Sequence, residues 1–436
     1  MSLKEALFKA GVVGQGGAGF PTHVKAGSSV EFMLANGAEC EPLVHKDLEI
    51  MVAHPEEIVR GFELMKNAVG AARAFFGIKK KNARAVKAIG EALGDVGETT
   101  LLGDFYPSGD EYELVYEATG RLIEPGGIPL GVGCVVNNVE TLYNVARAEA
   151  GVPLTDTFLS VNGAVQTPAA FFAPVGTSIR ECLDAAGGAT VPEPAVFVGG
   201  AMMGRLTFDL DEPTTKTTAG FIVLPRDHYL VTRMNREERA QHRIGKSACD
   251  QCSYCTEFCP RYLLGYNVQP HKVMRSLEFT KTGADVWNQM AELCCECGLC
   301  TLYACPEDLY PREACQMGKR EMRKLGIDYE QKEPPRVHPM KEGRRVPIKQ
   351  LVKKLHIAEY DRDTPYLERG PEPTTVRILL SQHVGAPSEP VVSKGDRVSK
   401  GDLVAEPPKD ALGARMHASI EGEVVEVASS HLTIKR

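Results

Sequence analysis

The chain has 436 residues, of which 25% are charged and 43% are hydrophobic, and its formal net charge is -7. At roughly 100–200 residues per domain, this length predicts several domains of ordinary soluble composition. Basic residues are outnumbered and form no long run, so nucleic-acid binding is not expected. No apolar run approaches the ~20 residues that cross a bilayer, and the N-terminus is unlike a signal peptide. We therefore expect a cytoplasmic protein that does not itself insert into a membrane.

Residues 1–150 alternate short apolar runs with helical patterns, for example at 57–74 and 83–93. This alternation predicts an α/β domain. The basic stretch Lys79-Lys80-Lys81, followed by Arg84 and Lys87, is interpreted as the solvated start of the second of these helices.

A glycine-rich segment near the N-terminus, Gly14-Gln15-Gly16-Gly17-Ala18-Gly19, matches the pattern G-x-G-x-x-G, with Glu39 about twenty residues further on. Phe20-Pro21-Thr22 follows at once. Because proline pushes the residue before it into an extended conformation, we expect the loop to continue rather than turn straight into a helix. A loop with so few side chains exposes backbone N–H groups, which suits a phosphate or a flat ring.

Residues 151–225 are expected to form a small β-grasp unit. Two strands, 157–161 and 166–172, are predicted around the turn Asn162-Gly163, which is a strong hairpin signal. A helix at 178–186, closed by Gly187-Gly188, and further strands at 195–198 and 221–224 complete the pattern.

Nine of the thirteen cysteines lie between positions 249 and 305. In a chain expected in a reducing compartment, such clustering indicates metal ligation rather than disulfides. Two C-x2-C-x2-C triplets are each followed by Cys-Pro, with three residues before the last cysteine in the first run and four in the second. The predicted ligands are Cys249, Cys252, Cys255 and Cys259 in the first run, and Cys294, Cys297, Cys300 and Cys305 in the second.

This pattern is typical of proteins that bind two 4Fe–4S clusters, in which the fourth cysteine of each run ligates the other cluster. Cys305 is therefore predicted to join the first triplet and Cys259 the second. A pair of structural zinc sites is the alternative, but it does not explain two triplets each followed by Cys-Pro. Cys295 is too close to Cys297 for the pattern, and Cys40, Cys134, Cys182 and Cys315 are expected to be small buried residues.

The remaining segments differ in composition. Residues 226–330 are polar and helical around the cysteines, and residues 331–373, rich in proline and charge, are interpreted as a linker with one helix. Residues 374–436 contain the direct repeat Val392–Val398 and Val398–Val404. Its Gly-Asp turns between valines predict a small β barrel or sandwich. Lys409 lacks the sequence context of a lipoyl or biotinyl lysine, so an unmodified docking domain is favoured.

Several motifs together resemble the RnfC/PduS family and, beyond it, the FMN- and NADH-binding flavoprotein of respiratory complex I. The similarity extends in order over nearly the whole chain. Where the complex I flavoprotein has an acid, this chain has Ala38, so that contact is not expected here. The motifs are Gly14–Thr22 with Lys25, Asn36–Pro42, Tyr106–Glu111, Asn137–Thr141 and Gly199–Gly204.

The resemblance implies a multidomain α/β fold: a flavoprotein domain at 1–150, an SLBB β-grasp domain at 151–225, a dicluster ferredoxin segment at 226–330, a linker at 331–373 and a barrel-sandwich hybrid at 374–436. RnfC proteins carry the last domain at the N-terminus, whereas here it is C-terminal, as in PduS-like members. The resemblance also implies catalytic roles at Glu39 and Glu41 in the flavin and nicotinamide cavity. The implied FMN- and NADH-binding residues are Gly14, Gly16, Gly17, Gly19, Phe20, Lys25, Asn36, Asp110, Glu111, Asn137, Asn138 and Thr141.

The function implied is an NADH-dependent oxidoreductase. NADH would give a hydride to FMN, and the two clusters would carry electrons singly to an acceptor. On domain order the expected acceptor is cob(II)alamin. An alternative is an RnfC-like protein that feeds a partner reductase, such as methylenetetrahydrofolate reductase. Another is an electron relay without NADH binding. Expected partners are cobalamin or a partner reductase or adenosyltransferase, in homo- or hetero-oligomers, in the cytoplasm or the lumen of a bacterial microcompartment.

Overall fold

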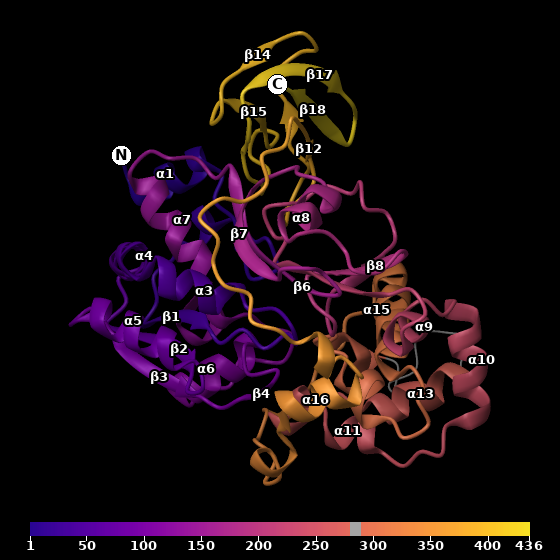
Figure 1. The fold of residues 1–436 in the computed structure, drawn as a ribbon. Coiled ribbons are helices and arrows are strands. Elements are labelled where there is room, and N and C mark those ends of the chain that lie inside the picture. The colour runs from indigo at the N-terminus through magenta and orange to yellow at the C-terminus, as the bar shows by residue number, and fades with distance from the viewer. Residues whose placement is uncertain (280–288) are drawn as a thin grey trace.

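The computed structural model describes residues 1–279 and 289–436, which form four packed units (Figure 1). The first contains a four-stranded parallel sheet with the strand order β3-β2-β1-β5. Its strands are β1 (Phe32–Gly37), β2 (Arg73–Lys79), β3 (Glu98–Leu102) and β5 (Cys134–Asn138). The helices of this unit are α1 (Leu3–Ala10), α2 (Thr22–Lys25), α3 (Lys46–Ala53), α4 (Pro55–Ala68), α5 (Ala83–Leu93), α6 (Glu111–Thr119) and α7 (Val139–Glu149).

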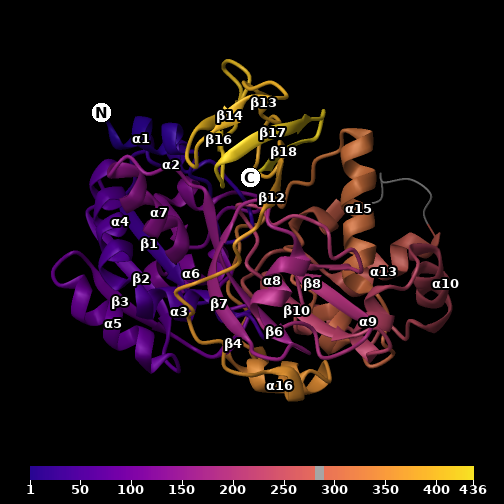
Figure 2. The same ribbon diagram turned by 45° about the horizontal axis from the view of Figure 1, so that its top comes forward.

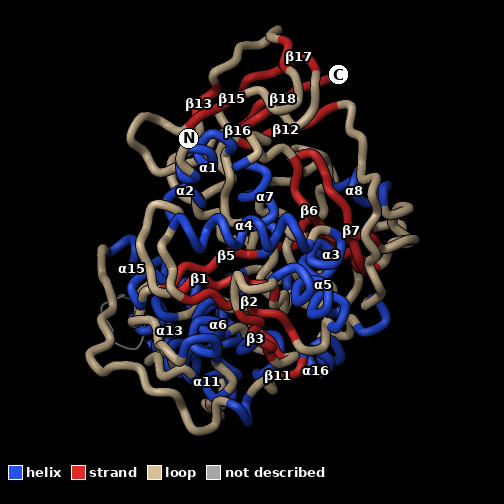
Figure 3. Tube along the Cα trace, turned by 90° about the vertical axis from the view of Figure 1, so that its left-hand side faces the viewer, coloured by secondary structure: helices blue, strands red, loops and turns tan. Residues whose placement is uncertain are grey.

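Alternate side chains of the strands face opposite layers of helices. Met33 and Ala35 of β1 join the core shared with α3, α4, α5 and α7, whereas Phe32 and Leu34 join the core shared with α6. Helices α4 and α7 pack closely because Gly61 has no side chain: a Cβ there would lie 1.8 Å from the carbonyl oxygen of Leu142. Helices α1, α4 and α7 lie between this sheet and the C-terminal strands (Figure 3).

Two sequence predictions in this unit are wrong in detail. The helix predicted at 57–74 ends earlier, at Ala68, because Gly70 takes a positive φ of 64° and strand β2 begins at Arg73. Lys79 is not part of a solvated helix start. It is the last residue of β2, it is buried, and its ammonium lies 3.3 Å from a carboxylate oxygen of Asp104. Helix α5 has the predicted bounds.

The second unit is a five-stranded sheet with the order β7-β6-β10-β8-β9. Asn162 and Gly163 do not form the predicted turn but end strand β6, and the chain turns at 164–168 instead. The buried Asn162 amide donates to the carbonyls of Leu43 and Arg362, at 3.3 and 3.0 Å, which explains the asparagine. The elements are β6 (Asp156–Gly163), β7 (Ala169–Pro174), α8 (Ile179–Ala185), β8 (Pro194–Val198), β9 (Arg205–Thr207) and β10 (Gly220–Pro225).

The cysteine-rich unit is helical, as predicted, and lies against both preceding units (Figure 1). The following segment was predicted to be a linker with one helix, and that helix is α16 (Ile348–Lys354). The segment also adds strand β11 (Val346–Pro347), which pairs with β4 (Phe105–Tyr106) of the first unit. The cysteine-rich helices are α9 (Tyr229–Met234), α10 (Glu238–Ala248), α11 (Tyr254–Glu257), α12 (Pro260–Leu263), α13 (Pro270–Phe279) and α15 (Pro311–Leu325), with single turns at Met290–Leu293, Cys300–Ala304, Glu342–Arg344 and Ala358–Tyr360.

The C-terminal unit consists of two small sheets around one core, in agreement with the predicted barrel or sandwich. In the part of the chain that the structure describes, no helix is long and apolar enough to cross a membrane. The strands are β12 (Thr375–Leu379), β13 (Glu389–Pro390), β14 (Arg397–Val398), β15 (Leu403–Glu406), β16 (Met416–His417), β17 (Gly422–Val427) and β18 (His431–Lys435).

A buried lysine joins this C-terminal unit to the rest of the molecule, at the place where it sits next to α1 and α2 (Figure 2). The amine of Lys216 donates to the carbonyls of Gly11 and Arg415, at 2.7 and 2.6 Å. Burial lowers the pKa of Lys216 to about 7. A neutral amine has two N–H groups, which match the two carbonyls, whereas an ammonium has a third N–H to satisfy. Burial also lowers the pKa of the nearby His383 and His417 side chains, to about 4 and about 3.

The stability of the fold should therefore depend on pH through Lys216. Between its folded pKa of about 7 and its unfolded pKa of 10.5 the unfolded chain binds more protons, so stability rises with pH over this window. We expect the free energy of unfolding of the native protein, relative to Lys216→Met, to increase by roughly 2–3 kcal/mol from pH 7 to pH 9. Anaerobic urea titrations at the two pH values measure this difference, with the exposed Lys87→Met as the control. An unchanged difference would contradict the assignment.

Candidate functional site

A cleft of about 770 Å³ opens at the carboxyl ends of β1 and β5. Strand β1 lies between β2 and β5 in the sheet, and ligands of open parallel sheets bind at the carboxyl ends of the strands. The register places Asn36 opposite Asn138 and Ala35 opposite Asn137. Residues of the second unit, among them Gly199 and Thr218, form the other wall. The tertiary structure thus brings together two motifs that are about 100 positions apart in the sequence.

Almost every residue that the sequence analysis selected for the flavin and the nucleotide lines this cleft. The exception is Gly19, where a Cβ would lie 3.2 Å from the Cα of His383, and whose carbonyl accepts from Val384 at 3.0 Å. Gly19 therefore packs against the C-terminal unit. The predicted residues in the lining are Gly14, Gly16, Gly17, Phe20, Lys25, Asn36, Glu39, Glu41, Asp110, Glu111, Asn137, Asn138 and Thr141.

The glycine-rich loop is closed at its base and bare at its tip. Gly14 donates to the Phe20 carbonyl at 2.8 Å, and the Gly19 N–H donates to Gly14 at 3.1 Å. Gly17, with a φ of 104°, has nothing within 4 Å of the position of a Cβ. Space of this kind beside exposed N–H groups fits a bound phosphate or ring. Contrary to the sequence prediction, the short helix α2 begins directly after Pro21.

Sequence reasoning missed a buried ionic network beneath the cleft. The ammonium of Lys46 lies 2.7 Å from Glu140 and 3.0 Å from Asp47, and the Gln15 amide donates to Glu140 at 2.6 Å. The two carboxylates raise the pKa of Lys46, so it stays charged. Asp47 in turn accepts from the amide of Asn138 at 2.7 Å, and the network therefore fixes the end of β5. The signal in the sequence was the charged first turn of α3, which contains Lys46, Asp47 and Glu49 and is followed only by apolar residues.

The two predicted catalytic glutamates are held differently. One Glu39 oxygen accepts from the Asp47 N–H at 3.1 Å, and no other hydrogen bond to this carboxyl is found among the described residues. Burial and the neighbouring Asp47 raise the pKa of Glu39 well above its usual range. Both Glu41 oxygens are occupied, by the N–H groups of Met202 and Met203, each at 2.9 Å. Burial raises the pKa of Glu41 to about 7. Glu41 thus anchors the loop after β8, and Glu39 keeps acceptor capacity toward the cleft.

Asp110 also has a structural partner that the sequence did not reveal. Its carboxylate caps helix α6 and forms a two-pronged ion pair with Arg261, with N–O distances of 2.5 and 3.0 Å. The Arg261 guanidinium lies 3.6 Å from the centre of the Tyr112 ring. Arg261 belongs to α12, and this helix begins directly after Cys259. The pair therefore attaches the cysteine-rich unit to the wall of the cleft.

The second cysteine group reaches the same cleft. Cys297 is part of the cleft lining, and the buried Tyr106 hydroxyl donates to the Cys297 carbonyl at 2.7 Å. Both Tyr106 and Cys297 are buried. A group bound at Cys297 would therefore be adjacent to a ring held in the cleft.

The first group of thiols is arranged as the crossed pattern predicts. Cys249, Cys252, Cys255 and Cys305 lie near one another. These four thiols line one small cavity, and Cys252 is exposed. Two groups of four thiolates are the ligand sets of two cubanes, which fits the donor chemistry of 4Fe–4S clusters. In the other group Cys259, Cys294, Cys297 and Cys300 lie near one another, and Cys295 lies near Cys259 and Cys297 as well.

Two further thiols lie close to the second group. Cys295 lies next to Cys297, and Cys315 lies next to Cys294. Cys315 is buried, as expected, but it is a direct neighbour of a predicted ligand. Within the described ranges no three Cys, His, Asp or Glu side chains surround a point suited to a single metal ion. Ligands of a cubane each bind a separate iron.

Four families match successive parts of the chain. Residues 7–147 match the Nuo51 FMN-binding domain and residues 158–206 the SLBB domain. Residues 248–310 match the 4Fe-4S dicluster domain, and residues 349–435 match the RnfC barrel sandwich hybrid domain. The last match begins within the predicted linker.

Relatives are similar over the full length. Cobalamin reductase PduS of Citrobacter freundii is 40% identical over 436 residues, 100% of this chain and 96% of that protein. The chain belongs to the PduS family. PduS of Salmonella typhimurium (strain LT2) is 41% identical over 435 residues, with the same coverage. A component of the Na(+)-translocating ferredoxin:NAD(+) oxidoreductase complex of Acetobacterium woodii is 32% identical over 275 residues, 61% of this chain and 59% of that one.

A solved structure shares the fold. An NAD+-reducing NiFe hydrogenase in the H2-reduced state aligns with a TM-score of 0.51 and 20% identity, covering 85% of this chain and 68% of that chain. Membership of the PduS family, together with the FMN-binding and dicluster domains, establishes this protein as an iron–sulfur flavoprotein oxidoreductase with FMN and two 4Fe–4S clusters. The expected fold class and family are thereby confirmed.

The bare tip of the glycine loop leads to a prediction about FMN. Gly17→Val should lower the FMN content of the purified protein at least tenfold, because the side chain would project into the open space of the cleft. Gly70→Val is a matched control. Gly70 also has a positive φ and nothing within 4 Å of a Cβ position, but it lies outside the cleft lining. Flavin released on denaturation measures the occupancy. Equal occupancy in the two variants would show that the loop does not bind FMN.

Proposed function

We propose that this protein is a cobalamin reductase that passes electrons from NADH through FMN and two 4Fe–4S clusters to cob(II)alamin. One observation supports this most directly: a single cleft extends from the glycine-rich loop to Cys297, so it joins a nucleotide site to a cluster ligand. The name of its full-length relatives, cobalamin reductase, supports the acceptor.

Within the cleft the residues would have separate tasks. The glycine loop and Lys25, whose ammonium donates to the Val136 carbonyl at 2.7 Å, would hold phosphates. Asn36, Asn137, Asn138 and Thr141 would hold the ribityl chain and phosphate of FMN. Glu39 would face the nicotinamide, where its carboxylate stabilises the positive charge that develops on that ring as hydride leaves.

When bound, FMN accepts a hydride and releases electrons one at a time. The protein's contribution is to hold the rings against the Cys297 group and to exclude water. The buried Tyr106 lines the cleft beside Cys297 and holds the Cys297 carbonyl by its hydroxyl. One NADH thus yields NAD+, a proton and two electrons, and two cob(II)alamin molecules each take one electron.

Loss of one cluster should slow electron transfer to cob(II)alamin but not hydride transfer to FMN. Cys297→Ser should weaken or abolish one cluster, because a hydroxyl is a poor substitute for a soft thiolate. NADH should still bleach the flavin at close to the native rate, since hydride transfer takes place in the first unit, while cob(II)alamin reduction should fall at least tenfold. Stopped-flow absorbance of the flavin and of the corrinoid measures both. Small dyes must be avoided, because they can take electrons directly from the flavin. Full cob(II)alamin reduction with a lost cluster would refute the route.

Glu39 provides a test of NADH chemistry. Its ionised form increases as pH rises through the elevated pKa, so the native rate of flavin bleaching should rise with pH above the usual range of a glutamate. Glu39→Gln should be about tenfold slower and independent of pH over the same range. Iron content and reduction of the clusters by dithionite should be unchanged. If NADH fails to bleach the flavin of the native protein, it is an electron relay without NADH binding.

A further inference from the structure

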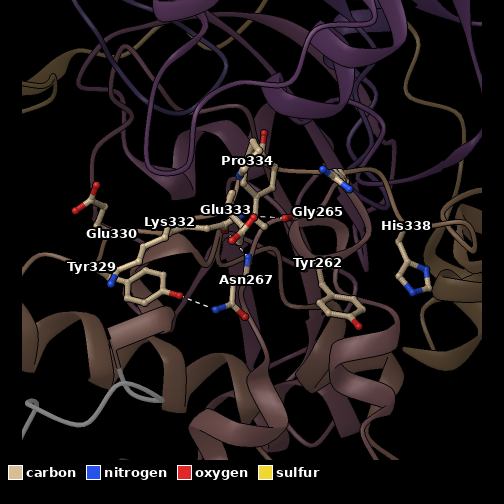
Figure 4. A pocket seen from close by; sticks show the side chains of 12 residues that line it. Tyr262, Gly265, Asn267, Tyr329, Glu330, Lys332, Glu333, Pro334 and His338 are labelled. Carbon is tan, nitrogen blue, oxygen red and sulfur yellow. Dashed lines mark hydrogen bonds between the residues drawn. The ribbon is translucent and has the colours of Figure 1, made fainter.

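A second hollow, of about 650 Å³, lies between residues 262–267 and 329–338 (Figure 4). Its volume is in the range of small-molecule sites, ~300–1,000 Å³. Three tyrosines line it, and in the view of Figure 4 Tyr262 and Tyr329 lie on either side of Asn267. The third is Tyr266, which is buried and donates its hydroxyl hydrogen to the Ile123 carbonyl at 2.7 Å. The hydride-transfer site described above does not use this hollow.

Fixed amides lie among these aromatic walls. The Asn267 side chain donates to the Tyr329 hydroxyl at 2.6 Å, and the Asn267 N–H donates to the Gln331 side chain at 2.7 Å. Gln331 in turn donates to the Gly265 carbonyl at 3.2 Å. These bonds hold the 329–338 segment over α12 and keep the hollow open.

The rim carries exposed charges of both signs. Lys332 and Arg336 are exposed cations, and no ion pair of either is found in the described part of the chain, while Glu330 and Glu333 are exposed acids. Aromatic walls with donors and acceptors at the rim suit a broad flat ring whose edge carries amides and a phosphate. A corrinoid is such a ring.

The hollow adjoins a cluster ligand. Tyr262 follows Cys259 by three residues in the turn of α12, a rise of about 4.5 Å along the axis. Tyr262 and Tyr329 also pack against the buried group that contains Cys259 and Leu293. The hollow and Cys259 thus border the same short helix and the same buried group of side chains.

The other cluster offers a different surface. Cys252 is exposed there and Tyr254 beside it is 45% exposed. The cavity at that place, however, is lined by the four thiols themselves, so a bound cluster would take up its space. A corrinoid therefore has no separate hollow at this cluster in which to bind.

We propose that the hollow at Tyr262 and Tyr329 binds the corrinoid acceptor, with the ring packed against the two tyrosines. This inference rests on the proposed function. Each cob(II)alamin bound there would take one electron supplied through the cluster that Cys259 would ligate, and would leave as cob(I)alamin. The balance is one NADH and two cob(II)alamin to one NAD+, one proton and two cob(I)alamin.

The test is binding of cob(II)alamin to the anaerobically purified holoprotein, measured by equilibrium dialysis without NADH. Tyr262→Ala and Tyr329→Ala should each weaken binding by about tenfold, the effect of losing one aromatic contact. Tyr262→Phe should bind like the native protein, because the ring is kept. Tyr254→Ala, at the other cluster, is the matched control and should have no effect. Tyr329 lies outside the cysteine motifs. Tyr329→Ala therefore still tests the site if Tyr262→Ala loses iron.

The outcomes separate the inference from the proposed function. Weaker binding in both alanine variants, with normal iron content and normal flavin bleaching by NADH, supports the site. If cob(II)alamin is reduced normally and binds equally to all variants, the site is elsewhere and the proposed function stands. Weaker binding in Tyr254→Ala alone would place the acceptor at the Cys252 cluster. Native protein that neither binds nor reduces cob(II)alamin would overturn the proposed function itself.

Discussion

Electron transfer between a flavin and a cluster requires that two separately folded units keep a fixed separation. In this structure the constraint is met by buried polar contacts rather than by a large apolar interface alone. Asp110 pairs with Arg261 in α12, and Tyr106 donates to the Cys297 carbonyl. The first contact joins the wall of the cleft to a residue two positions after the predicted ligand Cys259. The second joins it to the predicted ligand Cys297 itself. Removing one member of such a buried pair leaves an uncompensated polar group, so the arrangement tolerates little displacement.

The second unit takes part in the same arrangement through Glu41. Its carboxylate accepts from Met202 and Met203, and the Met202 carbonyl accepts from Arg312 of α15 at 2.7 Å. The loop after β8 is therefore held both by Glu41, which lines the flavin cleft, and by Arg312, which belongs to the cysteine-rich unit. This explains why a residue expected to be catalytic has both of its oxygens engaged in backbone hydrogen bonds. It also explains the small residues of the loop, since a Cβ at Gly200 would lie 2.4 Å from a Glu41 oxygen.

The sequence by itself determined the elements whose signals are local. Cysteine spacing predicted the two ligand sets, helical periodicity predicted α5 and α8, and the Gly-Asp repeats predicted the C-terminal strands. The motif order was sufficient to indicate the family. Where local signals competed with tertiary contacts, the prediction failed. Asn162-Gly163 has turn residues, yet Asn162 is held in β6 by carbonyls from two distant segments. Lys79 belongs to a basic run, yet it is buried because Asp104 lies next to it. Gly19 belongs to the glycine-rich pattern, yet it packs against the C-terminal unit.

Only the tertiary structure decided which residues converge. The parallel register sets Asn36 beside Asn138, and no local pattern encodes that pairing, because it depends on strand order. The buried Lys46 network, the Asp110–Arg261 pair and the hollow between Tyr262 and Tyr329 likewise join segments that are 60 to 150 positions apart, roughly, in the chain. The physical reason is general: a charge or polar group is buried only where a partner meets it, and that partner is chosen by packing and not by sequence distance.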